Sequence, residues 1–342
     1  SISGAQKWGL DSFPAARDYF FNEDLSPKLA NSRLLNKPLA ETFDLISKGG
    51  ANVFYEGSLA DSIVKSVRET KLNPGHVTLH DLASYQVKVR KPVCILYRVY
   101  EICGMGSPSS GGLTVGQILG ILENFDFKEP APSLKAAHLF IEASKLAYAD
   151  RALYMGDKDF IKVPEKGLID KRYLLNRAQL ITDVSSGKAT AGHPKGSKGL
   201  LRSLQQQSER PGTTHYVVVD KYGNAASVTS TIEMGFGSRV MVGGFLLNNE
   251  LTDFSFVPER NGRLIANRVQ GGKRPRSSMA PTVVLKGGKP FLITGSPGGS
   301  RIISYVARTI FNILEWGLDP QAALNSGHIV NRNGVTELEE GT

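Results

Sequence analysis

The sequence predicts an α+β fold, in which helices and strands occupy separate stretches of the chain instead of alternating. Three observations indicate this class. Helical periodicities dominate the first half, a stretch rich in Ser, Gly, Lys and Gln follows at about residues 183–212, and strand patterns from Thr214 lead into a last helix over residues 301–316. The chain has 342 residues, of which 41% are hydrophobic, so it is long enough to bury a substantial core.

Apolar residues at helical spacing predict several helices before residue 183. Residues 37–48 carry such a pattern and stop at Gly49-Gly50, which suits a helix C-cap. Ser58–Glu69 and residues 134–148 each place apolar residues on one face. A Thr-x-x-Asp pattern at Thr78 predicts a capping box and a short helix.

Three hairpins are predicted from alternating patterns around turns. PVCILYRVYEICGM pairs Cys94 with Cys103, which allows either a cross-strand disulfide or two small reduced core residues. HYVVVD and AASVTST flank a five-residue loop, so that unslipped antiparallel pairing places Thr213 opposite Thr231. TVVLKGGKPFLITG turns at its Gly-Gly pair.

Composition argues against several classes of function. The net charge is +9, but only KVRK at residues 88–91 and KRPR at residues 273–276 are dense, and neither is interleaved with aromatic residues. We therefore expect no nucleic-acid interface. The apolar runs are far shorter than the roughly 20 residues of a membrane span. The histidines lack ligand partners at metal-site spacing, so we expect no metal and no cofactor. A signal peptide, if there was one, is expected to be gone already.

The start of the central hairpin offers one chemical possibility besides a polar strand end. A threonine hydroxyl needs a base, and an N-terminal threonine carries one in its own α-amine. For Thr213 this requires scission of the Gly212–Thr213 bond, which follows a stretch predicted to be exposed and flexible. Separately, GSPGGSR places the amides of Gly298 and Gly299 before a helix, which suits an oxyanion, a phosphate or a tight turn.

Several ordered motifs carry a resemblance to a known family. TTHYVVVDKYGNAASVTSTI, GFLLNNELTDFS, GKRPRSSMAPT and GSPGGSRI resemble the small-subunit motifs of the γ-glutamyltransferase (γ-glutamyl transpeptidase) family. FYEGSLADSIV, GSPSSGGLTVGQILGILENFD and YADRALYMGDKDFIKVP resemble the later part of the large subunit of that family. The similarity covers nearly the whole chain.

The resemblance implies an N-terminal-nucleophile (Ntn) hydrolase with a four-layer αββα sandwich, made as a precursor that cleaves itself. Residues 1–212 would be the later part of the large subunit, residues 213–342 the small subunit, and both together one domain. The implied activity is γ-glutamyl transfer or hydrolysis, with glutathione or another γ-glutamyl compound as donor and an amino acid or water as acceptor. No cofactor is implied, and the usual location of the family is periplasmic or secreted.

Site residues follow from the resemblance position by position. Thr213 matches the nucleophile and Thr231 the supporting threonine, while Gly298 and Gly299 match the oxyanion-hole glycines. The remaining matches concern the donor: Glu250 and Asp253 for its α-ammonium, Ser277 and Ser278 for its α-carboxylate. Considered without the resemblance, the first pair is an acidic turn and the second a Ser-rich loop.

Three departures from the family pattern motivate other hypotheses. Glu233 stands where the family usually has an asparagine at the amino-acid end of the substrate, which favours a related amidase or acylase. The early large subunit is missing, and with it the arginine that clamps the donor carboxylate. The sequence also stops before the last strands of the small subunit, so we expect a further segment or chain to complete the sandwich. An unprocessed, non-catalytic homologue is the alternative outside the enzymes.

Overall fold

The computed structural model describes residues 1–129, 133–205 and 212–340, which form two compact units. Unit 1 comprises Ser1–Val89 and Ile232–Glu250, and unit 2 comprises Arg90–Thr231 and Leu251–Thr342. Each unit therefore contains chain from both sides of the Gly212–Thr213 bond. The expected division into a large and a small subunit at that bond remains a prediction.

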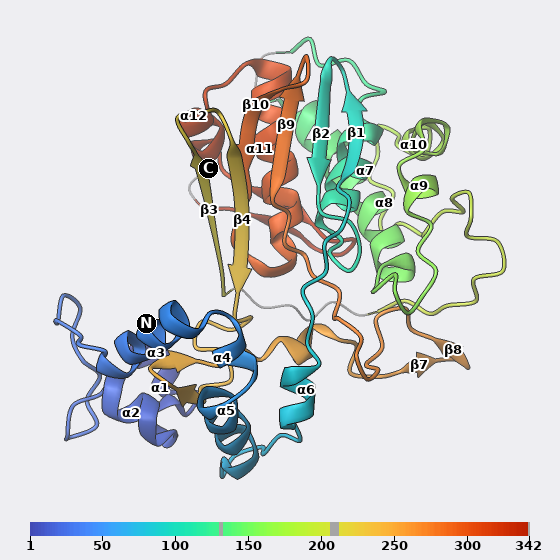
Figure 1. Cartoon of the computed structure of the whole chain (residues 1–342). Helices are drawn as coiled ribbons and strands as arrows, with labels where there is room; N and C mark the ends of the chain where they lie inside the picture. Colours follow the sequence, from blue (N-terminus) through green and yellow to red (C-terminus); the bar gives the residue numbers. More distant parts are fainter. Residues whose placement is uncertain (130–132, 206–211, 341–342) are drawn as a thin grey trace. The chain divides into compact units, whose positions relative to one another are not determined.

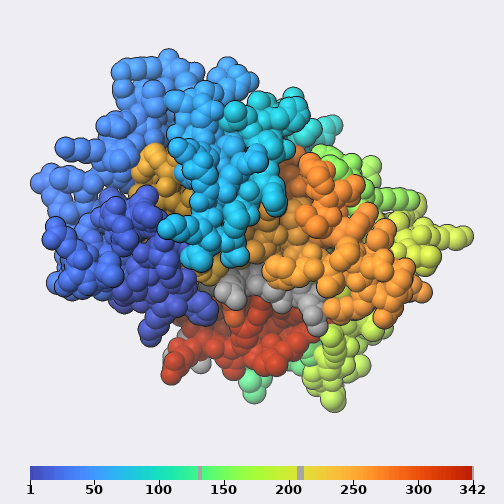
Figure 2. All heavy atoms as spheres, turned by 90° about the horizontal axis from the view of Figure 1, so that it is seen from below, coloured from blue at the N-terminus to red at the C-terminus, as the bar shows by residue number. Residues whose placement is uncertain are grey.

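Unit 1 is mostly helical, and its short strand pair is enclosed by the N-terminal segment. Figures 1 and 2 show residues 232–250 (gold) among residues 1–89 (blue to cyan). Val242 packs with Leu59 and Ile63 of α5 in one apolar cluster. The elements are α1 (Ile2–Gln6), η1 (Leu10–Ser12), α2 (Pro14–Phe20), α3 (Lys37–Gly49), α4 (Asn52–Tyr55), α5 (Ser58–Glu69), α6 (Leu79–Ala83), β5 (Met241–Val242) and β6 (Phe245–Leu246).

Unit 2 is built on an antiparallel sheet of four strands in the order β1-β2-β9-β10, with helices α7, α8 and α11 covering one face (Figure 1). Its core lies between that face and the three helices. The strands are β1 (Val93–Tyr97), β2 (Tyr100–Gly104), β9 (Thr282–Lys286) and β10 (Lys289–Thr294). The helices are α7 (Gly111–Leu122), α8 (Leu134–Tyr154), α9 (Glu165–Leu168), α10 (Lys171–Ala178), α11 (Ile302–Trp316) and α12 (Pro320–Asn325).

The remaining strands of unit 2 form separate pairs. The hairpin of β3 (Thr213–Val219) and β4 (Ala225–Thr231) lies beside β10, to which Ser227 Oγ donates a 3.2 Å hydrogen bond at Thr294 O (Figure 1). The other pairs are β7 (Glu259–Arg260) with β8 (Arg263–Leu264), and β11 (Ile329–Asn331) with β12 (Thr336–Leu338). Two 3-10 helices, η2 (Glu250–Asp253) and η3 (Gly299–Arg301), contain candidate site residues.

Most of the predicted elements are confirmed. All three hairpins form. Cys94 lies opposite Cys103 and Thr213 opposite Thr231, as expected. The third hairpin turns at Gly287-Gly288, and its register shifts between Pro290 and Leu292. The helix at Ser58–Glu69 has the predicted bounds, and Thr78 closes a capping box with Asp81. Helix α8 continues six residues beyond 148. The helices that were not predicted include α7, whose all-round burial leaves no apolar stripe.

Residues 183–205 form neither helix nor strand. They are nevertheless anchored to unit 2, since Gly192 N donates to Asp150 Oδ1 at 2.8 Å and Arg177 donates to Thr190 O at 2.8 Å. The end of the predicted connector, residues 206–211, lies outside the described residues. In the described part of the chain, no helix has both the length and the apolar content needed to cross a bilayer.

Candidate active site

The two threonines of the central hairpin lie side by side. Thr213 Oγ1 donates a hydrogen bond to Thr231 Oγ1 at 3.2 Å, and Thr231 Oγ1 lies 3.5 Å from the carbonyl oxygen of Gly212. The strand register produces this arrangement, because directly opposed residues of an antiparallel pair point to the same face. Two hydroxyls therefore flank the carbonyl of the predicted scissile bond.

His215 follows on the same face of β3, two residues after Thr213. Its Nδ1 is 2.8 Å from Thr229 Oγ1, and burial lowers the pKa of its imidazole below the ordinary value. The ring lies so close to Gly295 that a β-carbon there would come 2.2 Å from Cε1. The imidazole thus packs between β3 and the GSPGGSR segment, as expected of a packing residue.

Gly298 and Gly299 lie at the turn before α11, with φ angles of +136° and +60°. Non-glycine residues rarely adopt these angles, so the turn depends on glycine. Among the described residues, no hydrogen bond from either amide to a backbone group outside the helix is found. The role of these glycines at an oxyanion remains a prediction.

Ser300 and Arg301, which follow these glycines, are held by hydrogen bonds from Arg332 and to Glu337. Arg332 donates to Ser300 Oγ at 2.7 Å and to Glu337 Oε1 at 2.6 Å, while Arg301 Nε donates to Glu337 Oε2 at 2.6 Å. Burial raises the pKa of Glu337, but the hydrogen bonds from both arginines outweigh it, and the pKa lies below its ordinary value. Arg332 and Glu337 also line a cavity of about 730 Å³.

Ser277 and Ser278 are held by a second serine-rich segment, residues 107–110 before α7. Ser110 donates through both its amide and its hydroxyl to Ser277 O, at 2.8 and 2.7 Å. Ser109 Oγ donates to Met279 O at 2.5 Å. A β-carbon at Gly111 would come 2.3 Å from that same oxygen, so the two segments approach as closely as glycine allows.

Two fully buried arginines, Arg151 and Arg276, lie next to the two serine-rich segments. Arg151 of α8 donates from Nε to Ser110 Oγ at 2.8 Å and from Nη2 to Ser278 Oγ at 2.6 Å. Arg276 donates from Nη1 to Arg151 O at 3.3 Å. Burial lowers the pKa of neighbouring Lys273 to about 8. The KRPR cluster is therefore partly internal.

The acidic candidates divide between the two units. Asp253, in unit 2, is buried at the end of η2, and its carbonyl accepts from Asn267. Glu250, in unit 1, begins the same 3-10 helix. Glu233, also in unit 1, is buried, has a φ of +70°, and accepts a short hydrogen bond from Asn249 Nδ2.

Sequence reasoning missed three residues that support these segments: Ser110, Arg151 and Glu337. The motif GSPSSGG contains Ser110, but nothing in it indicates a contact with residues 277–278. Arg151 lies within a helix and Glu337 near the end of the sequence, so neither has a local signature. Their contacts join Glu337 to Arg301, Arg151 to Ser278 and Ser110 to Ser277, which are 36, 127 and 167 positions apart in sequence.

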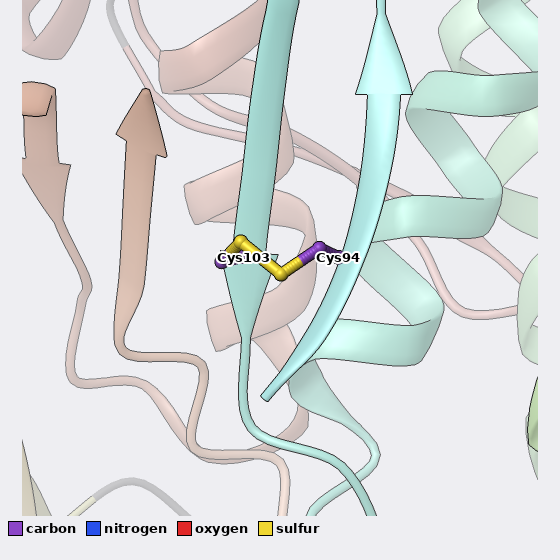
Figure 3. Close-up of a disulfide and its surroundings, with 2 residues drawn as sticks. All are labelled: Cys94 and Cys103. Carbon is purple, nitrogen blue, oxygen red and sulfur yellow. A yellow bond between two sulfur atoms is a disulfide. The ribbon is translucent and has the colours of Figure 1, made fainter. Parts of the chain in front are cut away.

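The cysteines form a disulfide between β1 and β2 (Figure 3). The sequence had left open either a disulfide or two reduced core cysteines, and the structure has the disulfide. Cys94, Glu101 and Cys103 are the single group of metal-ligand type found within the described ranges. Because both of its sulfurs are bonded to each other, that group lacks the thiolates that bind metals.

Comparison with known proteins identifies the family. Residues 2–342 match the gamma-glutamyltranspeptidase family model. The chain is 41% identical over 314 residues to the glutathione hydrolase proenzyme of Escherichia coli (strain K12), covering 90% of this chain and 52% of that protein. It is 40% identical over 337 residues to the glutathione hydrolase proenzyme of Bacillus subtilis (strain 168), covering 96% and 56%. The chain thus spans about half the length of these relatives.

A solved structure gives the same result for the fold. Cephalosporin acylase from Bacillus halodurans superposes with a TM-score of 0.81 at 26% identity, over 95% of this chain and 55% of that chain. This likeness, together with the separate helices and sheets, confirms the predicted α+β, Ntn-hydrolase class. From its motifs, its fold and its similarity over residues 2–342, the chain belongs to the γ-glutamyltranspeptidase family.

Proposed function

We propose that this chain is part of an amide-cleaving acyl transferase that transfers γ-glutamyl groups to water or an amino acid through Thr213. The observation that carries the proposal is the hydroxyl pair Thr213–Thr231 beside the carbonyl of Gly212. Membership of the γ-glutamyltranspeptidase family and similarity to glutathione hydrolase proenzymes support the choice of a γ-glutamyl donor.

Maturation is the first step. Thr213 Oγ1 attacks the carbonyl carbon of Gly212, the C–N bond to Thr213 breaks, and the nitrogen leaves as the α-amine after taking a proton. Thr231, whose hydroxyl is 3.5 Å from the Gly212 oxygen, can donate to the oxyanion that forms there. Water then hydrolyses the ester, which gives a new carboxylate at Gly212 and restores the Thr213 hydroxyl. The products are a large subunit whose later part is residues 1–212 and a small subunit that begins at Thr213, and the two stay associated.

Turnover repeats this chemistry on an external amide. The freed α-amine accepts the Thr213 hydroxyl proton while Oγ1 attacks the γ-carbonyl of the donor. The leaving amine departs with a proton, and the acyl group remains as an ester on Thr213. The amides of Gly298 and Gly299 stabilise the oxyanion; one such donor is worth about 3–4 kcal/mol in other enzymes.

The two ends of the donor's amino-acid group require opposite partners. Ser277 and Ser278 supply hydroxyl donors for the α-carboxylate, and Glu250 and Asp253 supply acceptors for the α-ammonium. The burial of Ser278 and Asp253 strengthens such contacts, because screening by water is reduced.

A related acylase activity is the second candidate, and Glu233 favours it. Its carboxylate is buried and hydrogen-bonded to Asn249, where the family resemblance implies an asparagine amide. A negative charge near the amino-acid end of the substrate disfavours a donor carboxylate. The structural likeness to a cephalosporin acylase agrees with a change of acyl group within the same fold.

We also propose that the protein functions outside the cytoplasm, in the periplasm or after secretion. The Cys94–Cys103 disulfide supports this location, because such bonds persist mainly in oxidising compartments. Fractionation of the native host, with detection of the protein by antibody, tests the proposal. Recovery of the protein in the cytoplasmic fraction with both thiols reduced would contradict it.

Substrate choice tests the proposed function. The purified protein is assayed with the p-nitroanilides of γ-glutamate, of glutarate and of acetate. The γ-glutamyl amide should be hydrolysed fastest, and addition of a dipeptide acceptor should accelerate release of p-nitroaniline. A preference for the glutaryl amide would favour the acylase. Cleavage of none of the three would support the non-catalytic alternative.

A further inference from the structure

We propose that Arg151 is a positioning residue for recognition of the donor's α-carboxylate, acting through Ser278 and Ser110. The inference rests on the proposed function and deepens it by assigning a residue to carboxylate specificity. Arg151 lies on α8, 127 positions before Ser278 in the sequence, and is fully buried. It therefore acts from beneath the site and does not touch the substrate.

The direction of the hydrogen bonds determines what Ser278 can do. A hydroxyl has one proton and two lone pairs, whereas a guanidinium can only donate. Because Arg151 Nη2 donates to Ser278 Oγ at 2.6 Å, one lone pair of that oxygen is occupied. The proton of Ser278 cannot point at Arg151 and must point elsewhere. A bond accepted from a charged donor also makes that O–H a stronger donor.

Ser277 is fixed through the same guanidinium. Arg151 Nε donates to Ser110 Oγ at 2.8 Å, and the Ser110 hydroxyl donates a hydrogen bond to Ser277 O at 2.7 Å. One planar group, rigid and always charged, thus orients both segments that carry the carboxylate-binding serines. It also places a permanent positive charge behind them, in a region where water screens little.

The helix that carries Arg151 also holds the oxyanion turn. Tyr148, one turn earlier on α8, is fully buried and donates from its hydroxyl to Ser300 O at 2.5 Å. Residues three apart lie on the same helix face. The continuation of α8 beyond residue 148 therefore sets the carboxylate-binding serines and the oxyanion glycines in one rigid frame. This makes Tyr148→Phe a matched control for Arg151.

The test compares two donors that differ only in the α-carboxylate: γ-glutamyl-p-nitroanilide and 4-aminobutanoyl-p-nitroanilide. The ratio of their kcat/KM values does not depend on how much of a variant is folded. Arg151→Met should lower this ratio by about 10- to 100-fold, mainly through a higher KM for the γ-glutamyl donor. Arg151→Lys should restore part of it. Tyr148→Phe should slow both donors equally and leave the ratio unchanged.

Ser110→Ala is a milder variant, which tests the role of Arg151 if Arg151→Met fails to fold. It removes the acceptor of Arg151 Nε and should lower the ratio several-fold. A ratio within about twofold of wild type in Ser110→Ala, or in Arg151→Met where that variant folds, would overturn the inference while leaving the proposed function intact. Wild-type protein that cleaves neither donor would instead reject the proposed function, and this inference with it.

Discussion

The imidazole of His215 packs against the backbone of Gly295, so closely that a β-carbon on the glycine would come 2.2 Å from Cε1. His215 is two residues from Thr213 on β3, and Gly295 opens the segment that leads to Gly298 and Gly299. This contact therefore holds β3 against the Gly298–Gly299 segment, between the hydroxyl proposed to attack and the amides proposed to stabilise the oxyanion.

Gly295→Ala should lower kcat without preventing folding. The added methyl group forces the imidazole and the turn apart, and a displacement of about 1 Å in an active site costs on the order of 100-fold in rate. The measurement is steady-state kinetics with γ-glutamyl-p-nitroanilide. Gly271→Ala is the control, because a β-carbon there meets no atom within 4 Å. Adding His215→Ala should restore part of the activity; equal kcat in Gly295→Ala and wild type would contradict the account.

Glu337→Gln should change how stability depends on pH. The pKa of Glu337 is lowered in the folded protein, so its ion pairs stabilise the fold above the ordinary pKa of 4.5, and this contribution is lost as the pH falls through the lowered value. Wild type should therefore have the higher Tm at pH 7, and the difference should shrink below pH 4.5. Thermal unfolding of both proteins between pH 3 and 7 measures it. A Tm difference that stays constant with pH would show that the charge of Glu337 does not matter.

The disulfide should contribute to stability. Removing a bridge that closes a loop of about ten residues costs on the order of 2–3 kcal/mol, mainly by freeing the unfolded chain. The double variant Cys94→Ala/Cys103→Ala should accordingly unfold at lower denaturant concentration, with its catalytic rate retained. Equal denaturation midpoints with and without the bridge would contradict this, as would the detection of two free thiols in the native protein.

Local sequence patterns were sufficient to predict the helices and strands that present one face to the core. The register of β3 and β4 followed from two alternating segments around one loop, and with it the meeting of Thr213 and Thr231. The capping box at Thr78 and the Gly-rich end of α3 were equally local. Each of these depends on residues within about 20 positions, where spacing alone is informative.

The other parts of the fold and of the candidate site depend on contacts between residues far apart in sequence, which no local pattern encodes. Helix α7 is buried on every side and carries several glycines, so it shows neither a helical stripe nor a strand alternation. Arg151 is a charged residue inside a helix, and only its meeting with Ser110 and Ser278 gives it a role. The chemical roles of all the candidate site residues remain predictions.

The most direct test of the account is the intact mass of the purified protein under denaturing conditions. The account predicts two polypeptides that part between Gly212 and Thr213 in the wild type and in Thr213→Ser, and one uncut polypeptide without activity in Thr213→Ala. A wild-type enzyme that hydrolyses γ-glutamyl-p-nitroanilide while Thr213 remains in an intact peptide bond would contradict it.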